Sequence, residues 1–150
     1  MTLSTASLAR DANGVPIQGL GFQTTKTVAF DGTAGNGAQG TITLFTVTGT
    51  VMLNAFGFCT EDLASTTGTV ALGVTGSTAA LADLQTATNV DNHEVWHESI
   101  LAIGGLVANH FHPSDQNVIL TIATADVTNG TIAFYCNWFP VTSNGDVTAA

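Results

Sequence analysis

Positive charge is almost missing from this sequence. Its 150 residues include two basic side chains against 11 acidic ones, and the formal net charge is −9. Both bases, Arg10 and Lys26, come before residue 27, so the rest of the chain has no lysine or arginine. Such a chain cannot displace counterions from nucleic acid, and its body cannot clamp a phosphate or carboxylate substrate with a permanent charge. We therefore expect no nucleic-acid partner, and many enzyme classes are disfavoured.

Long apolar runs and cysteines are also scarce. The uncharged stretch 99–109 is about half as long as a membrane-spanning helix and contains two glycines, so we expect no membrane partner. The start of the chain lacks a basic leader followed by an apolar block, which disfavours export by a signal peptide. Cys59 and Cys136 lie in apolar stretches, where a buried free thiol is the expected state. The alternative is a disulfide between the two cysteines, which requires that their strands be neighbours.

What the sequence does contain is alternation. With 45% hydrophobic residues, the chain is apolar enough to bury one core in one domain. Apolar residues alternate with small or polar ones in several short runs, a pattern that indicates half-buried strands. The clearest core faces are Val70, Leu72 and Val74; Val118, Leu120 and Ile122; and Ile132, Phe134, Cys136 and Trp138.

The spacing of these runs and of the turn signals predicts an all-β fold, an antiparallel β-sandwich or jelly roll. Residues 1–26 lack periodicity and are predicted to form an extended N-terminal arm ahead of a single domain, 27–150. The first strand is expected at 27–30, and a break between two strands at Thr48-Gly49. Only residues 77–85 combine an N-cap candidate with good helix formers, so at most one short helix is predicted.

One motif matches a metalloprotease signature. The segment from His93 to His97 reads H-E-x-x-H, in which two histidines one helical turn apart bind zinc and the glutamate is the general base. The surrounding glycines, asparagines and β-branched residues disfavour the necessary helix, and Ile103 stands where a third histidine would follow. His110 and His112 would be able to join a partial site. We expect no cofactor, and leave open whether any of these four histidines binds a metal.

A second alternative concerns the aromatic residues. Trp96 and Phe139 would suit a carbohydrate- or receptor-binding surface if they were exposed, whereas alternation assigns Trp138 to the core. The sequence contains no nucleophile elbow or phosphate loop, and we predict that the protein is not an enzyme.

Four segments carry a family resemblance: LARDANGVPIQGL, GTITLFTVTGTVMLNAFGFCT, NHEVWHES and DVTNGTIAFYCNWFPVTSNGDVTAA. Together they resemble the capsid decoration, or cement, proteins of tailed bacteriophages. The resemblance implies a jelly-roll-like homotrimer that binds the major capsid protein on the outer capsid surface of the virion, assembled in the host bacterial cytoplasm. A tail, neck or head-fibre component is the alternative within this class. Arg10 and Lys26 are the candidate capsid contacts.

Overall fold

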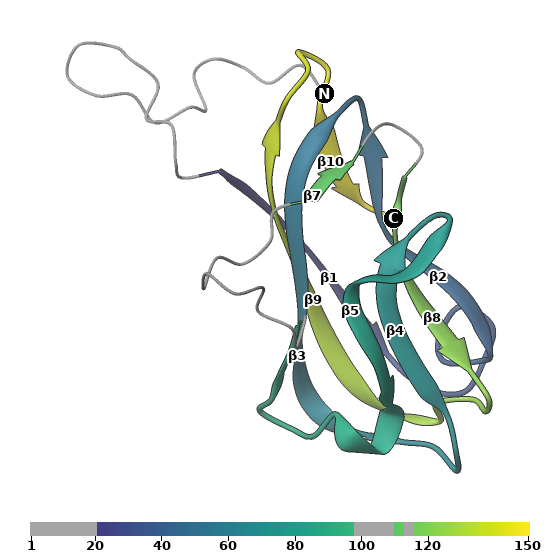
Figure 1. Cartoon of the computed structure of the whole chain (residues 1–150). Helices are drawn as coiled ribbons and strands as arrows, with labels where there is room; N and C mark the ends of the chain where they lie inside the picture. Colours follow the sequence, from purple (N-terminus) through teal and green to yellow (C-terminus); the bar gives the residue numbers. More distant parts are fainter. Residues whose placement is uncertain (1–20, 98–109, 113–115) are drawn as a thin grey trace.

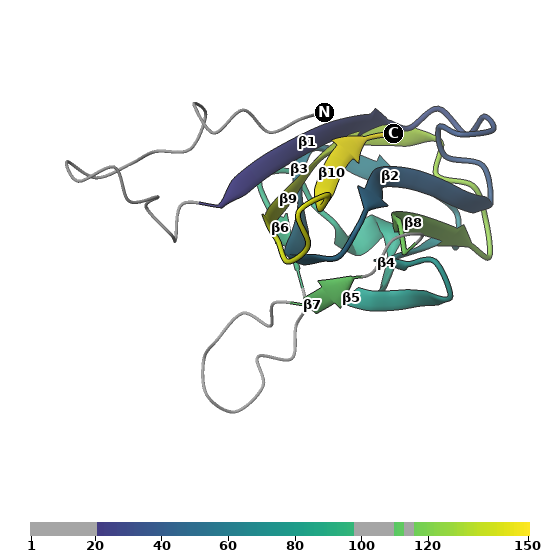
Figure 2. The ribbon, with the colours of Figure 1, turned by 90° about the horizontal axis from the view of Figure 1, so that it is seen from above.

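The protein is a sandwich of two antiparallel sheets (Figures 1 and 2). The computed structural model describes residues 21–97, 110–112 and 116–150. The first sheet has the order β1 (Phe22–Ala29), β9 (Asn129–Pro140), β3 (Val51–Ala64), and both β6 (Val95–Trp96) and β7 (His110–His112) pair with β3. The second sheet has the order β10 (Asp146–Ala149), β2 (Gly40–Thr48), β8 (Val118–Ala123), β4 (Thr69–Val74), β5 (Ser77–Thr86).

The strands pair in a nested order. β4 pairs with β5, β3 with β6 and β7, β2 with β8, and β1 with β9. This order results when one long antiparallel hairpin folds over on itself, which is the jelly roll. The predicted all-β sandwich is thus confirmed. In the described part of the chain, the helical element is the 3-10 turn η2 (Ala87–Asn89), and no helix there is long and apolar enough to cross a bilayer.

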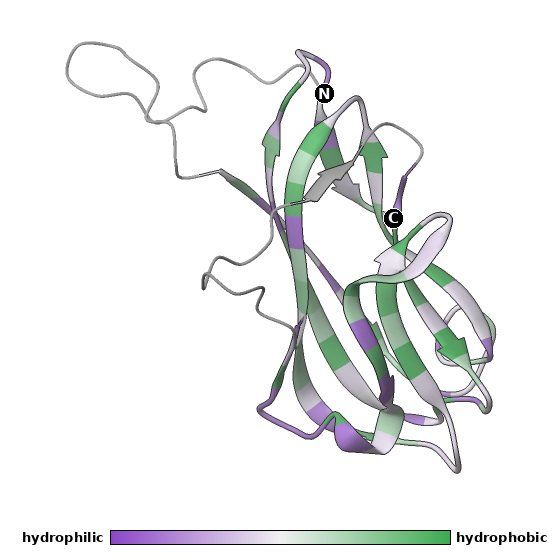
Figure 3. Ribbon diagram, in the orientation of Figure 1, coloured by the Kyte–Doolittle hydropathy of each residue, from purple (hydrophilic) through white to green (hydrophobic). Residues whose placement is uncertain are grey.

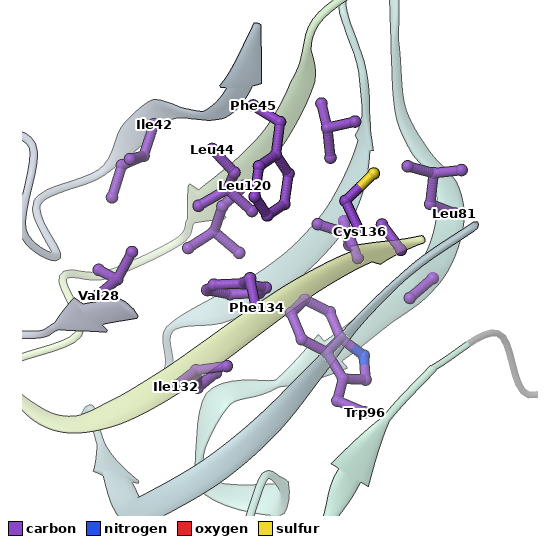
Figure 4. Packing of buried hydrophobic residues seen from close by; sticks show 14 of the residues in the cluster. Val28, Ile42, Leu44, Phe45, Leu81, Trp96, Leu120, Ile132, Phe134 and Cys136 are labelled. Carbon is purple, nitrogen blue, oxygen red and sulfur yellow. The ribbon is translucent and has the colours of Figure 1, made fainter. Parts of the chain in front are cut away.

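The core lies between the sheets and uses the residues that alternation assigned to it. All three alternating sets named from the sequence are buried. Phe45 and Phe134 are the largest fully buried side chains, and Figure 4 shows Phe134 beside Ile132 and Trp96. Each buried side chain of this size stabilises the fold by about 1.5–3 kcal/mol relative to exposure.

The predicted helix at 77–85 is wrong, because these residues form β5. Gly76, with a φ of 90°, closes a tight turn that brings the chain back alongside β4. Leu72 of β4 then pairs with Ala82, and Leu81 is buried against the core. Alanine, leucine and glutamine favour helices by only a few tenths of a kcal/mol each, which pairing and burial outweigh.

The first strand also differs from its prediction. The break at Thr48-Gly49 is confirmed, but β1 begins at Phe22, five residues before the expected start at residue 27. Lys26 therefore lies within a strand of the sheet, whereas the sequence had placed it at the end of the arm. Residues 22–26 were missed because their inward positions are partly polar, so no apolar alternation marks them.

The last strand of the first sheet is interrupted. β6 and β7 pair with the same strand, with Trp96 opposite Gly57 and His110 opposite Leu53. If β6 continued as one strand, the residue opposite Leu53 would be residue 100. The residue observed there is His110, so the chain between β6 and β7 contains ten more residues than a continuous strand would. Two short strands thus occupy the place of one.

Candidate assembly surfaces

Negative charge is concentrated at one end of the sandwich, here called the acidic end. Six carboxylates lie there, four in the turns and two at the end of β3, and five of the six residues are exposed. Contacts connect these segments: the backbone N–H of Asn92 donates to Asp62 Oδ1 at 2.6 Å, and that of Gln39 donates to Asp126 Oδ1 at 2.8 Å. Figure 3 shows hydrophilic residues around the turn that leads from η2 to β6. The acidic residues are Asp31, Glu61, Asp62, Asp91, Glu94 and Asp126.

The opposite end, here called the arm end, is nearly neutral. It consists of the turn at Gly49, the turn 141–145 and the start of β1, and the carboxylate described there is that of Asp146. The two turns are tied together, because Val141 N donates to the Thr50 carbonyl at 2.9 Å. Val141 itself is 53% exposed. The molecule is therefore polarised, with carboxylates at one end and neutral side chains at the other.

Lys26 closes the edge of the sandwich between β1 and the second sheet. Its Nζ donates to the Thr43 carbonyl of β2 at 2.9 Å and to the Ala150 carbonyl at 2.7 Å. Two residues earlier in β1, on the same side of the strand, Thr24 Oγ1 donates to the Val147 carbonyl of β10 at 2.9 Å. The same oxygen accepts a hydrogen bond from the indole N–H of Trp138. Lys26 thus has a structural role that sequence analysis missed, and its contact with a capsid stays a prediction. Arg10 lies outside the described residues.

The histidine motif does not form a zinc-protease helix. Val95 and Trp96 are in β6, and His93 has a φ of 69°, outside the helical range. His110 and His112 belong to β7, and the β3 partners of Trp96 and His110 are four residues apart, about 13 Å along the strand. Among the described residues, no cluster of three or more His, Cys, Asp or Glu side chains could hold a metal ion.

Trp96 is not a platform for sugar stacking. Only 6% of it is exposed, and its ring meets Phe134 edge-on with centroids 6.4 Å apart. Its indole N–H is buried without a hydrogen-bond partner. The adjacent cleft, lined in part by Gln85, Glu94 and His97, has a volume of about 210 Å³, whereas typical ligand pockets measure roughly 300–1,000 Å³. Trp96 therefore does not provide the exposed ring that the carbohydrate-binding alternative required, and the predicted core position of Trp138 is confirmed, since 2% of it is exposed.

The two cysteines are free and buried, as the sequence predicted. They belong to adjacent strands, but Cys136 is opposite Ala55 and Cys59 is opposite Ile132, so no disulfide joins them. Burial raises the pKa of Cys136 to about 12. Burial also raises the pKa of Cys59, and the nearby carboxylates of Asp62, Asp91 and Glu94 add to this shift. Both thiols are thus kept protonated, which removes their nucleophilic form.

The outer face of the first sheet carries a set of apolar residues that sequence analysis did not recognise as one surface, although it named Phe139 as a candidate binding residue. These side chains alternate with the buried positions of β3 and β9 and are half-buried. Phe56 stacks on Tyr135 with ring centroids 5.3 Å apart, and Met52 is opposite Phe139. The sequence did contain a signal for this surface, because the residues between the core positions of these two strands are themselves largely apolar. We call this surface the aromatic face: Met52, Phe56, Phe58, Tyr135 and Phe139.

The aromatic face lacks charge. The polar residues beside it are neutral: Asn54 is opposite Asn137, whose Oδ1 accepts a hydrogen bond from Gln23 at 3.0 Å. Val95 of β6, which is 51% exposed, pairs with Phe58 at the margin of the face. Uncharged aromatic surface with amide neighbours is typical of protein contacts, since charged residues are depleted at interface cores.

Comparison with known proteins gives a likeness in fold. No family model matches the chain, and no curated protein matches its sequence. One solved structure, described as the acidic stable capsid structure of Helicobacter pylori bacteriophage KHP30, contains a chain that superposes with a TM-score of 0.57. The superposition covers 87% of this chain and 94% of that chain, with 9% sequence identity. The protein therefore shares its jelly-roll fold, over nearly its whole length, with a chain from a bacteriophage capsid structure.

Proposed function

We infer that this protein is a non-enzymatic structural component of a bacteriophage virion, a decoration protein that binds the outer surface of the major capsid protein shell and stabilises it. The observation that carries this proposal is the likeness in fold, over nearly the full length, to a chain of a phage capsid structure. The buried, protonated cysteines and the absence of a zinc-protease helix in β6 are consistent with a structural role.

The polarised charge supports a defined orientation on the shell. In this proposal the arm end, with exposed Val141, faces the capsid, because neutral apolar surface loses little on desolvation. The acidic end faces solvent, where its carboxylates stay hydrated and repel neighbouring particles. Arg10 is the other basic residue of the chain, and in this proposal it contacts carboxylates of the capsid.

Self-association would strengthen attachment. A trimer presents three copies of the same weak contact, and linking them raises the overall affinity by avidity, without any new type of contact. The trimeric state comes from the family resemblance and belongs to this proposal. A monomeric attachment protein would instead need one extensive interface of its own.

The test is binding of the purified protein to undecorated shells of the phage that encodes it, measured by cosedimentation. Val141→Asp places a charge on the arm end and is expected to weaken binding at least tenfold. Thr66→Asp, at an exposed position near the acidic end, is the matched control and should bind like the wild type. Equal binding by both variants contradicts the orientation. Binding to purified tails or necks and not to shells contradicts the decoration role.

A further inference from the structure

The aromatic face lies on the outside of the sandwich, where the described elements provide no third layer. The main contacts of β1, β3 and β9 with other described elements run to one another, to the strands of the second sheet, to β6 and β7, and to η2. Stacked aromatic rings without charge on an outer sheet surface are expensive to leave in water, at about 25 cal/mol for each Å² of apolar area. A contiguous apolar surface of this kind marks an interaction site.

The chain that precedes β1 starts beside this face. Gly21 has a φ of 54°, and a Cβ added there would lie 2.8 Å from Cζ of Phe139. The backbone at Gly21 therefore rests directly on a ring of the aromatic face. Phe22, the next residue, points inward and stacks on Trp138 with ring centroids 4.7 Å apart. Gly21, the residue that follows the segment 1–20, thus lies at the outer surface, at the arm end of the first sheet.

Direction and length point to a neighbouring molecule. β1 runs from the arm end towards the acidic end, so the preceding chain would have to reverse its direction to cover its own sheet, whereas contact with a neighbouring copy requires no reversal. Twenty residues span up to about 66 Å when extended, whereas the 12 residues of β9 span about 40 Å. The segment has Leu3, Leu8, Val15, Ile17 and Leu20 to bury, and Arg10 and Asp11 as its charged side chains.

We propose that residues 1–20 of one copy pack their apolar side chains on the aromatic face of an adjacent copy, so that the arms link the copies to one another. This inference goes beyond shell attachment, since it concerns contacts between copies of the same chain. The fit is chemical: a segment whose charged side chains are confined to the adjacent, opposite pair Arg10 and Asp11 meets an uncharged, aromatic sheet surface with its apolar residues. The Asn54 and Asn137 amides supply neutral hydrogen-bonding partners for its backbone.

The first experiment measures the mass of the full-length protein in solution by light scattering. The wild type should be a multiple of the 15.3 kDa chain. Both deletion of residues 1–20 and Phe56→Lys should shift the mass to that of one chain, which is 15.3 kDa for Phe56→Lys and lower for the shortened chain. Thr46→Lys adds the same charge at an exposed position of β2 in the other sheet, and it should leave the mass unchanged. A monomeric wild type, or an oligomer that survives the deletion, would overturn the inference.

A second experiment identifies the occupant even if a variant fails to fold. A photo-crosslinking phenylalanine analogue replaces Tyr135 in unlabelled protein, which is mixed with an excess of ¹⁵N-labelled wild type. Peptic peptides should show position 135 joined to a labelled peptide from residues 1–20. Joining only to an unlabelled peptide of the same chain, to residues 98–109, or to the aromatic face of a second copy would each refute arm exchange. Because no shells are present, failure here is distinguishable from failure to bind the capsid.

Discussion

Replacement of Lys26 by methionine tests whether this residue holds the edge of the sandwich closed. Methionine keeps most of the apolar stem but removes the ammonium group that donates to the Thr43 and Ala150 carbonyls at 2.9 and 2.7 Å. A hydrogen bond from a charged donor contributes about 1.5–3 kcal/mol when partly buried. The bond to Ala150 is exposed, so solvent screening leaves it a small share. We therefore expect a total loss of about 1.5–3 kcal/mol in the free energy of unfolding.

Urea titration followed by tryptophan fluorescence measures this loss, since Trp96 and Trp138 are both buried and will report unfolding. With a slope of about 2 kcal/mol per M, the midpoint should fall by about 1 M. Thr27→Met, at an exposed position of the same strand, is the control and should change stability by less than about 0.5 kcal/mol. If Lys26→Met is as stable as this control, the two hydrogen bonds do not hold the sheets together. Shell binding by folded Lys26→Met would then show whether Lys26 also contacts the capsid.

Three further outcomes are expected. Neither Cys59 nor Cys136 should react with a thiol reagent at pH 8 in the native protein, whereas both should react in guanidinium; rapid native labelling would contradict their burial. Gly73→Ala should lower stability by about 2–4 kcal/mol in urea titration, because its Cβ would lie 2.2 Å from the Ser77 carbonyl oxygen; a smaller loss would mean that β5 can shift. The pKa of Asp31 is lowered by hydrogen bonds from a neighbouring threonine, so its contribution to stability is present above pH 3.8 and is lost as the pH falls below it; Asp31→Asn should remove this part of the pH dependence of unfolding.

The strands that could be predicted from the sequence were those with one face in the core and the other outside it. In β8 and β9 every second residue is apolar because it enters the core, so the sequence alone identified both strands and their inward faces. β5 was mistaken for a helix, since its local composition favours helix and the partner that makes it a strand is fixed by a turn at Gly76. The start of β1 was missed because Thr24 and Lys26 occupy inward positions as hydrogen-bond donors to the other sheet.

The surfaces were harder to predict than the core. No local pattern shows that segments far apart in the sequence bring six carboxylates to one end, because this depends on how the strands are connected in space. The aromatic face needed the pairing register, which places Phe56 against Tyr135 across two strands 79 positions apart in the chain. The histidine motif was correctly doubted, since its flanking residues disfavour a helix, but its actual state as β6 depends on pairing with β3.

The edge strand of the first sheet, which is divided into β6 and β7, accommodates inserted chain. Ten residues beyond the needs of a continuous strand are accommodated between β6 and β7 without loss of register on either side. Doubling the length of a closed connection costs only about 0.6 kcal/mol in chain entropy, which is small against the stability of an ordinary domain. The site is therefore a natural entry point for foreign peptide. An epitope inserted there would be displayed from the sheet edge while both flanking strands kept their partners, which makes the fold a carrier for antigen presentation.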